Sequence, residues 1–255
     1  MIKLNQSVFF ETELFTKHFP TLMVTDKWSE YDYVGTISWK AHIKFTKAFN
    51  FGMFNLSDAV TSAPPNVDVI ALVGQKNPRF DNMLNESNKN HHKFAFIWTE
   101  LLSQFPQFTP EQVSTDGMIP FYCNYWLAKP QHVIRFIPFM ERAQHLLTNL
   151  TSIQEALWSN PRYVGNKHVA KSVFGRKYYA YHPFILERLT PFFFNAEHRS
   201  IYVYKHFKNI TQLKKKKKKR STEAEEAQDE EEAAGEFAVS VVKDEGMKRK
   251  YWPQK

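Results

Sequence analysis

The clearest pattern along the chain is a short apolar run that leads into a long amphipathic stretch. The run from Phe121 to Leu127 is rich in aromatic residues and holds the polar Asn124 at its centre, which is typical of a β-strand. Pro130 then suits the first turn of a helix, because proline has no N–H to donate. Beyond it, apolar residues recur on one helix face, at Val133, Phe136, Ile137, Met140, Ala143 and Leu147. The pattern predicts a strand over 121–127 followed by a helix over 130–148.

Other apolar runs predict further strands. The run Val67–Val73 is nearly continuous, as in strands that are buried on both faces. Apolar and polar residues alternate over Tyr33–Ser38, and Ile201–Tyr204 is expected to form a last strand. We expect the first two of these runs and the strand over 121–127 to share one central sheet. The alternation with helical stretches predicts a mixed α/β domain.

Helical periodicity accounts for most of the remaining chain. A helix over 91–105 is expected to pack on the sheet, together with the helix over 130–148. Pro20 is expected to end a first helix over 7–19, and Pro138 to kink the helix that contains it. The polar stretch 75–90 is expected to be a loop. Further short helices are expected over 56–61, 153–158, 168–174 and from 184 onward.

The composition changes after Tyr204. Lys214–Arg220 is an unbroken basic block, and Ser221–Glu236 is largely Glu and Ala. Blocks of like charge repel and cannot bury apolar surface. We therefore expect an α/β domain over 1–207, a disordered charged segment over 208–236, and a C-terminal tail over 237–255. Within that tail, Phe237 to Val242 is expected to pack back as a strand.

Composition and charge narrow the class of protein. Of 255 residues, 43% are hydrophobic and 16% aromatic, which is ample for a packed core. Of the net charge of +8, the body before Lys214 carries +6, from 22 basic and 16 acidic residues without obvious clustering, so a nucleic-acid partner is not expected. The Lys214–Arg220 block is an alternative nucleic-acid arm, but the acidic block behind it would compete for its lysines. The single cysteine, Cys123, fits a reducing compartment. No apolar run approaches the roughly 18 residues of a membrane span, so we expect a cytoplasmic protein without a transmembrane segment.

Common catalytic and ligand-binding motifs are missing from the sequence. There is no Walker-type phosphate loop, no Gly-x-Gly-x-x-Gly, no zinc-type Cys/His spacing and no Gly-x-Ser-x-Gly. The adjacent His91 and His92 point about 100° apart on a helix, and no third ligand follows at helical spacing, so no metal ligand is assigned. Asp32 and Asp68 adjoin strands and read as turn or strand-end residues. Asn124 is better placed for binding, because open α/β sheets bind ligands at strand carboxyl ends.

Four segments, taken together and in order, resemble one family. Phe10–Thr12 approximates a Tyr-Glu-Leu-Thr helix, and Tyr33–Lys40 approximates a Tyr-Ile-Gly-x-x-His-Tyr-Arg strand. Asn124–Leu127 is similar to an Asn-Met-Phe-Ile strand, and His182–Leu189 to a Phe-Gly-Phe-x-x-Glu-Arg-Leu helix start. These segments resemble the GT-A-like glycosyltransferases encoded in bacterial polysaccharide loci and, in related forms, by large DNA viruses and protists. The resemblance spans roughly residues 7 to 204 and implies a GT-A-like mixed sheet flanked by helices.

The sequence also departs from that family. Ser38 and Lys40 stand where the family has His and Arg, which puts the role of that position in doubt. The family usually begins with a βα segment that starts the nucleotide-binding half, and this chain starts after it. We expect either an internal start at Met1 or a reduced fold. The body of the chain has no Asp-x-Asp, the pair with which many such transferases hold a metal.

The resemblance implies transfer of a sugar from a nucleotide-sugar donor to a glycan or polysaccharide acceptor, with Mn²⁺ or Mg²⁺ as a possible cofactor. Glu187 would be the base or would orient the acceptor, while Arg188 would handle phosphate or developing charge. Asn124 would hydrogen-bond sugar or ribose. The remaining substrate-binding residues implied are Trp126, Lys40, Trp39 and Glu11. Two alternatives stay open: Glu187 and Arg188 form a buried ion pair that fixes the helix to the sheet, or the protein is a non-catalytic carbohydrate-binding or scaffold protein.

Overall fold

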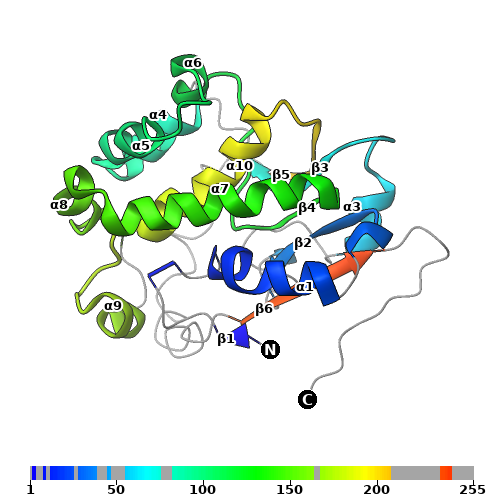
Figure 1. The fold of residues 1–255 in the computed structure, drawn as a ribbon, viewed down its shortest axis with the longest axis horizontal. Coiled ribbons are helices and arrows are strands. Elements are labelled where there is room, and N and C mark those ends of the chain that lie inside the picture. The colour runs from blue at the N-terminus through cyan, green and yellow to red at the C-terminus, as the bar shows by residue number, and fades with distance from the viewer. Residues whose placement is uncertain are drawn as a thin grey trace, which may run out of the picture.

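A central mixed sheet organises the protein (Figure 1). The computed structural model describes residues 2–3, 8–9, 12–25, 28–38, 45–46, 55–75, 82–163, 167–207 and 236–242. The strand order is β1-β6-β2-β4-β3-β5. Only β3 and β5 are parallel, and every other neighbouring pair is antiparallel. The strands are β1 (Ile2–Lys3), β2 (Tyr33–Ser38), β3 (Val69–Gln75), β4 (Trp126–Ala128), β5 (Ile201–Phe207) and β6 (Glu236–Val242).

The sheet confirms several predictions from the hydrophobic pattern. The three strands expected to share one sheet are its neighbours β2, β4 and β3. The expected return of the C-terminal stretch is also confirmed, because Phe237 to Val242 of β6 pair with β2. Gly35 shows how closely β2 and β4 pack: a Cβ at this position would lie 2.0 Å from the carbonyl oxygen of Trp126. The expected disorder over 208–236 falls almost entirely on residues outside those described.

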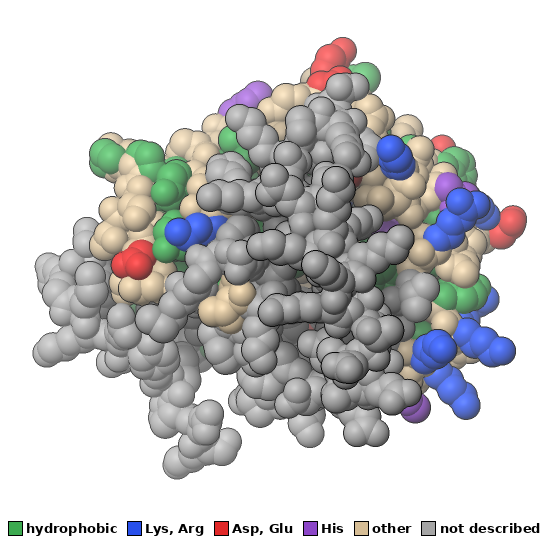
Figure 2. Space-filling model, turned by 180° about the vertical axis from the view of Figure 1, so that it is seen from behind, with side chains coloured by type: hydrophobic (Ala, Val, Ile, Leu, Met, Phe, Trp, Pro, Cys, Tyr) green, Lys and Arg blue, Asp and Glu red, His purple; other side chains and the backbone are tan. Residues whose placement is uncertain are grey.

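Helices cover both faces of the sheet (Figure 1). A five-residue π-helical segment, Leu14–His18, leads directly into the first α-helix. The α-helices are α1 (Phe19–Thr25), α3 (Leu56–Thr61), α4 (Met83–Asn90), α5 (Phe94–Leu102), α6 (Pro110–Ser114), α7 (Pro130–Asn149), α8 (Gln154–Leu157), α9 (Lys167–Phe174) and α10 (His182–Ala196). The mixed α/β architecture with flanking helices is therefore as predicted. On the face opposite to that of Figure 1, lysine and arginine side chains gather at the lower right, the side on which α9 lies (Figure 2).

The core explains why β3 reads as a continuous apolar run. Val69 and Ala71 point into a large cluster formed with α1, α5, α7 and α10. Ile70 and Leu72 point to the other face, into a smaller cluster that includes Ala59 of α3. Because successive strand residues face opposite sides, a strand covered on both sides is apolar at every position. The fully buried Trp126 lies in the larger cluster, where its ring packs 5.5 Å from that of Phe136.

Three predictions about element boundaries are wrong. Pro20 does not end a helix but lies within α1, which continues the preceding π-helical segment without a break. Residues 75–90 are not all loop, because α4 occupies Met83–Asn90, with the side chain of Asn82 accepting from the N–H of Asn85. The strand over 121–127 is reduced to the three residues of β4. By contrast, α7 matches its prediction and continues through Pro138.

Candidate functional site

The turn just before β4 lies at the carboxyl ends of the parallel strands β3 and β5. The N–H of Tyr122 donates to the carbonyl of Val73 at 3.2 Å, which fixes the turn to the end of β3. Cys123 and Asn124 are both in the left-handed region, with φ of 66° and 49°. Asn tolerates this region better than most residues, and such non-glycine positions cost about 1–3 kcal/mol each. This conformation is why the apolar run over 121–127 does not continue as a strand.

Asn124 connects this turn to two other elements. Its backbone carbonyl accepts from the hydroxyl of Thr36 in β2, and its side-chain Oδ1 accepts from the hydroxyl of Thr190 in α10 at 3.2 Å. Only 5% of Asn124 is exposed. Its side chain therefore faces protein, and the prediction that it meets a ligand is not supported by its surroundings. Asn124 instead holds β2, the turn and α10 together.

Glu187 and Arg188 of α10 form the charged centre of the site. Glu187 accepts a hydrogen bond of 2.6 Å at Oε1 from the N–H of Cys123, and its Oε2 is paired with the guanidinium of Arg188. The side chain of Glu187 is 23% exposed and that of Arg188 13%. Both groups are thus held rigidly at the sheet edge while keeping some access to solvent. The two residues predicted to be catalytic lie beside the turn that carries Asn124.

A second carboxylate completes the cluster from α4. The guanidinium of Arg188 lies over the ring of Tyr122, 4.7 Å from its centroid. The hydroxyl of Tyr122 donates to Oε2 of the buried Glu86 at 2.6 Å. Sequence reasoning missed Glu86 because α4 was expected to be a loop. The signal that was present is Asn82 before the pair Met83 and Leu84, a helix cap followed by apolar residues.

The electrostatics of the cluster keep Arg188 charged and Tyr122 protonated. Burial by itself lowers the pKa of Arg188, but the charge of Glu187, followed by Tyr122 and Glu86, raises that pKa above its usual value. Burial, reinforced by the charge of Glu86, raises the pKa of Tyr122 far above its ordinary range. The phenol is therefore a permanent donor to Glu86. The site offers one fixed cation between two carboxylates.

Aromatic rings border the charged centre. Phe184 precedes Glu187 and Arg188 by one turn of α10, and the ring of His91 lies 4.3 Å from it. His91 is held through Nδ1, which lies 2.9 Å from the carbonyl oxygen of Pro161. Burial lowers the pKa of His91, so this ring is neutral at physiological pH. Tyr163, which is 44% exposed, contacts the edge of Phe184 at 5.1 Å.

Trp126 is the one other residue predicted to bind substrate that falls within the described part of the chain. Trp126 is fully buried among Phe15, Phe136 and Phe194, so its ring belongs to the core and does not face a ligand. This placement corrects the expectation from the sequence. It follows from the alternation of side chains in β4, which turns Trp126 toward the helices. Trp39, Lys40 and Glu11 lie outside the described residues.

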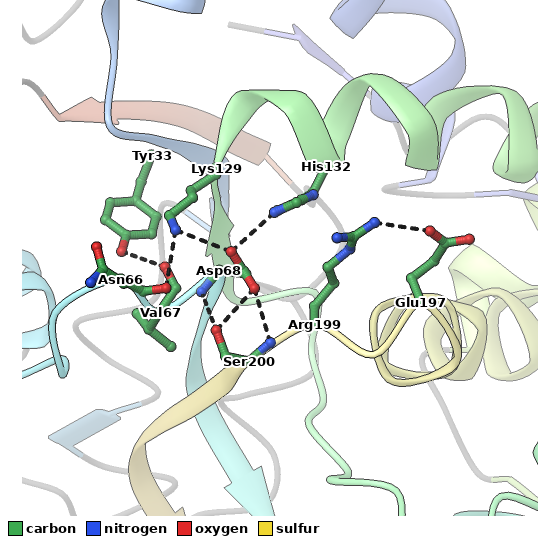
Figure 3. Close-up of polar contacts among 9 residues, drawn as sticks. All are labelled: Tyr33, Asn66, Val67, Asp68, Lys129, His132, Glu197, Arg199 and Ser200. Carbon is green, nitrogen blue, oxygen red and sulfur yellow. Dashed lines mark hydrogen bonds and ion pairs between the residues drawn. The ribbon is translucent and has the colours of Figure 1, made fainter.

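A second polar cluster lies at the amino ends of β3 and β5, opposite to the Glu187 cluster (Figure 3). Asp68, just before β3, accepts from Lys129 and His132 at 3.1 Å each, and from both the N–H and the hydroxyl of Ser200. Burial would raise the pKa of Asp68, but the hydrogen bonds from Ser200, Lys129 and His132 outweigh it and hold the pKa well below its usual range. The carboxylate is saturated by protein donors. It joins the starts of β3, β5 and α7, as a strand-end residue would.

The donor set of the Glu187 cluster does not fit a divalent metal. The guanidinium of Arg188 already occupies the position next to Glu187 that a cation would take, and Glu86 accepts from Tyr122. Over the described part of the chain, no group of three or more His, Cys, Asp and Glu side chains is arranged to hold a metal ion.

Comparison with protein-family models, with curated proteins and with solved structures found no match to this chain. Among the described helices, none is both long enough and apolar enough to cross a membrane.

Proposed function

We propose that this protein is a glycosyltransferase-like protein that transfers a sugar from a nucleotide-sugar donor to a glycan acceptor at the Glu187–Arg188 cluster. One observation carries the proposal: three of the four segments that resemble GT-A-like glycosyltransferases meet at one turn. Thr36 of the second segment bonds to Asn124 of the third, and Thr190, which directly follows the fourth, bonds to the same residue. Glu187 of the fourth segment accepts from the neighbouring N–H of Cys123.

The position of the cluster supports a ligand-binding role. It lies at the carboxyl ends of β3 and β5, the edge at which open α/β sheets bind their ligands. Asp68 and its partners lie at the other ends of these strands and are saturated by protein donors. The partly exposed charges at the carboxyl edge are therefore better candidates for chemistry than the satisfied charges at the opposite edge.

Glu187 has the chemistry of a general base for this transfer. The acceptor hydroxyl oxygen would form a bond to the anomeric carbon, the bond from that carbon to the diphosphate oxygen would break, and the electron pair would leave on the diphosphate. The hydroxyl proton would pass to the carboxylate of Glu187. Within the described part of the chain, each of its oxygens makes one hydrogen bond, and a carboxylate oxygen has two lone pairs. A positioned general base contributes typically about 10²–10⁴-fold in rate.

Arg188 would stabilise the charge that develops on the leaving diphosphate. Its guanidinium stays charged at any working pH, since nearby acidic groups raise its pKa. Its Nη1 is paired with Glu187, and a guanidinium carries five N–H donors in all. The group therefore has donor capacity beyond its pairing with Glu187. A fixed cation in a partly dry site is an effective stabiliser of such charge.

Non-catalytic carbohydrate binding is a second candidate function. The observation that favours it is the engagement of both oxygens of Glu187, by Cys123 and by Arg188. In that case Glu187 would accept hydrogen bonds from sugar hydroxyls without taking a proton. The ion pair would serve mainly to hold α10 against the turn.

Ligand-observed NMR with the full chain separates these functions. UDP-, GDP- and dTDP-sugars are screened with and without Mn²⁺, and donor hydrolysis is followed in the same samples. Binding together with hydrolysis supports transfer. Binding of free glycans without any nucleotide sugar supports the second candidate, and binding of neither rejects both.

A further inference from the structure

A basic surface lies next to the proposed site and is not used by it. Between Glu155 and Glu187 the sequence contains no Asp or Glu. The same stretch contributes five exposed basic residues, Arg162, Lys167, Lys171, Arg176 and Lys177, which we call the α9 surface. Lysine and arginine side chains gather on the side of α9 in Figure 2. Such a one-signed field attracts polyanions.

The lysines of α9 face solvent because the apolar side of the helix packs against the domain. Val169, Ala170 and Phe174 of α9 are buried against the domain, which leaves Lys167 and Lys171 on the solvent side. These two lysines lie one helical turn apart, and like charges at this spacing destabilise a helix. An anionic ligand that bridges them would relieve this repulsion.

The guanidinium of Arg176 is preorganised by contacts within the protein. Its guanidinium lies 5.7 Å from the ring centroid of Trp158, and Nη1 donates to the hydroxyl of Tyr178 at 3.0 Å. Stacking and hydrogen bonding of this kind reduce the entropy that an arginine loses on binding. Arg176 therefore offers a preorganised guanidinium beside two flexible lysines.

An exposed tyrosine links the α9 surface to the proposed site. Tyr163 follows Arg162 directly, and its ring is stacked on that of Tyr179 with centroids 5.7 Å apart. Its edge contact with Phe184, 5.1 Å between centroids, brings it to the helix that carries Glu187 one turn later. An extended ligand on the α9 surface would therefore cross Tyr163 on its way to Glu187.

We propose that the α9 surface binds the acceptor, and that this acceptor is an anionic saccharide chain bearing carboxylate, sulfate or phosphate groups. The proposal rests on the proposed function, since it names the substrate class of that site. The lysines and arginines pair with the anionic groups of the chain. The exposed ring of Tyr163, apolar in its body and polar at its tip, packs against one sugar ring. The terminal hydroxyl of the chain then lies toward the carboxylate of Glu187.

Two other polyanions fit this surface less well. Single-stranded nucleic acid is bound by several exposed rings on which successive bases stack, whereas among the described residues of this surface only Tyr163 is largely exposed. A membrane surface calls for an apolar helix face that enters the bilayer. The apolar side of α9 is instead buried in the protein. A saccharide chain requires only one ring for each sugar that stacks.

The test is binding of the full chain to a sulfated hexasaccharide, to oligogalacturonate and to neutral dextran by titration calorimetry at 50 and 200 mM salt. The wild-type protein is expected to bind both anionic saccharides, more weakly at the higher salt concentration, and to bind dextran at least about tenfold more weakly than either. The variant K167Q/K171Q/K177Q is expected to lose about tenfold or more in affinity for the anionic saccharides. The variant K17Q/K89Q/R135Q, which removes the same number of charges elsewhere, is expected to change that affinity less than about twofold.

Tyr163 provides a second readout. Tyr163→Ala is expected to weaken binding of the hexasaccharide while Tyr163→Phe retains most of it, because the ring and not the hydroxyl makes the contact. Equal affinities for the two triple variants would overturn the proposal. So would tighter binding to a single-stranded RNA or to vesicles containing phosphatidylserine than to either anionic saccharide. Binding of UDP-, GDP- and dTDP-sugars is measured in the same samples: saccharide binding without donor binding leaves the α9 surface standing and rejects only the transfer activity.

Discussion

The backbone N–H of Cys123 donates a hydrogen bond of 2.6 Å to Oε1 of Glu187, across 64 residues of sequence. It joins a left-handed turn at the carboxyl end of β3 to a partly buried side chain of α10. Two charged side chains thereby become fixed at the sheet edge where α/β proteins bind ligands. The proposed activity depends on this junction, and so does part of the stability of the fold.

Thr190 also ties α10 to the turn before β4, and the contribution of this contact to stability can be measured. Thr190→Val removes the hydroxyl that donates to the buried Oδ1 of Asn124. We expect a loss of about 1–3 kcal/mol in the free energy of unfolding, because a buried acceptor is left without its donor. Urea denaturation measures the change. Thr61→Val, which removes an exposed hydroxyl from α3, is the control and should cost less than about 0.5 kcal/mol.

The Asp68 cluster should contribute stability but not activity. Asp68→Asn replaces a carboxylate that binds Lys129, His132 and Ser200, and we expect a loss of about 2–3 kcal/mol. Since the folded-state pKa of Asp68 is lowered, its stabilisation is present above the unfolded pKa of about 4 and is lost as the pH falls further. Unfolding curves at pH 7 and pH 3 should therefore differ less in this variant than in the wild type. Asp32→Asn, at an exposed position, is the control, and reduced donor binding by Asp68→Asn would contradict the placement of the site.

His182 should make the fold sensitive to mild acid. Burial among Phe9, Trp158 and Phe174 lowers the pKa of this histidine from 6.5 to about 4. Between these values the unfolded chain takes up a proton that the folded protein excludes, so stability falls as the pH drops from about 6.5 to 4. The loss approaches about 3 kcal/mol below pH 4.

His182→Phe is expected to remove this part of the pH dependence, because the replacement ring carries no titrating group. Chemical denaturation at pH 7.5, 5.5 and 4 provides the measurement. His92→Gln, at an exposed position, should retain the wild-type profile. The same loss of stability with and without His182 would show that other groups, such as the buried His91, carry the acid sensitivity.

The elements that the sequence predicts well are those whose pattern is set by burial alone. α7 has one apolar stripe, and β3 is covered on both faces, so each shows its period directly. α4 was missed because its sequence, MLNESNKN, is almost entirely polar. Its only local signals are the Asn82 cap and the pair Met83 and Leu84, and the helix packs against the neighbouring α5.

Local motifs single out Glu187, Arg188 and Asn124 as candidate site residues. The structure brings the three together at one turn, although Asn124 is buried there. What no local pattern reveals is the left-handed backbone at Cys123, which buries Asn124 and aims an N–H at Glu187. The pairing of Tyr122 with Glu86 was equally hidden, since it joins two segments 36 residues apart.

The most direct test of the account is the turnover of Glu187→Gln. The substitution keeps an oxygen that can accept from Cys123 but removes the negative charge and the basic oxygen. Glu197→Gln is the matched control, because Glu197 terminates the same helix and is also paired with arginines, Arg135 and Arg199.

Donor hydrolysis and sugar transfer are measured for both variants with the nucleotide sugar that the wild type binds. We predict that Glu187→Gln lowers kcat by about 10²–10⁴-fold with little change in donor affinity, while Glu197→Gln stays within about twofold of the wild type. Wild-type turnover by a folded Glu187→Gln protein would contradict the assignment of the site.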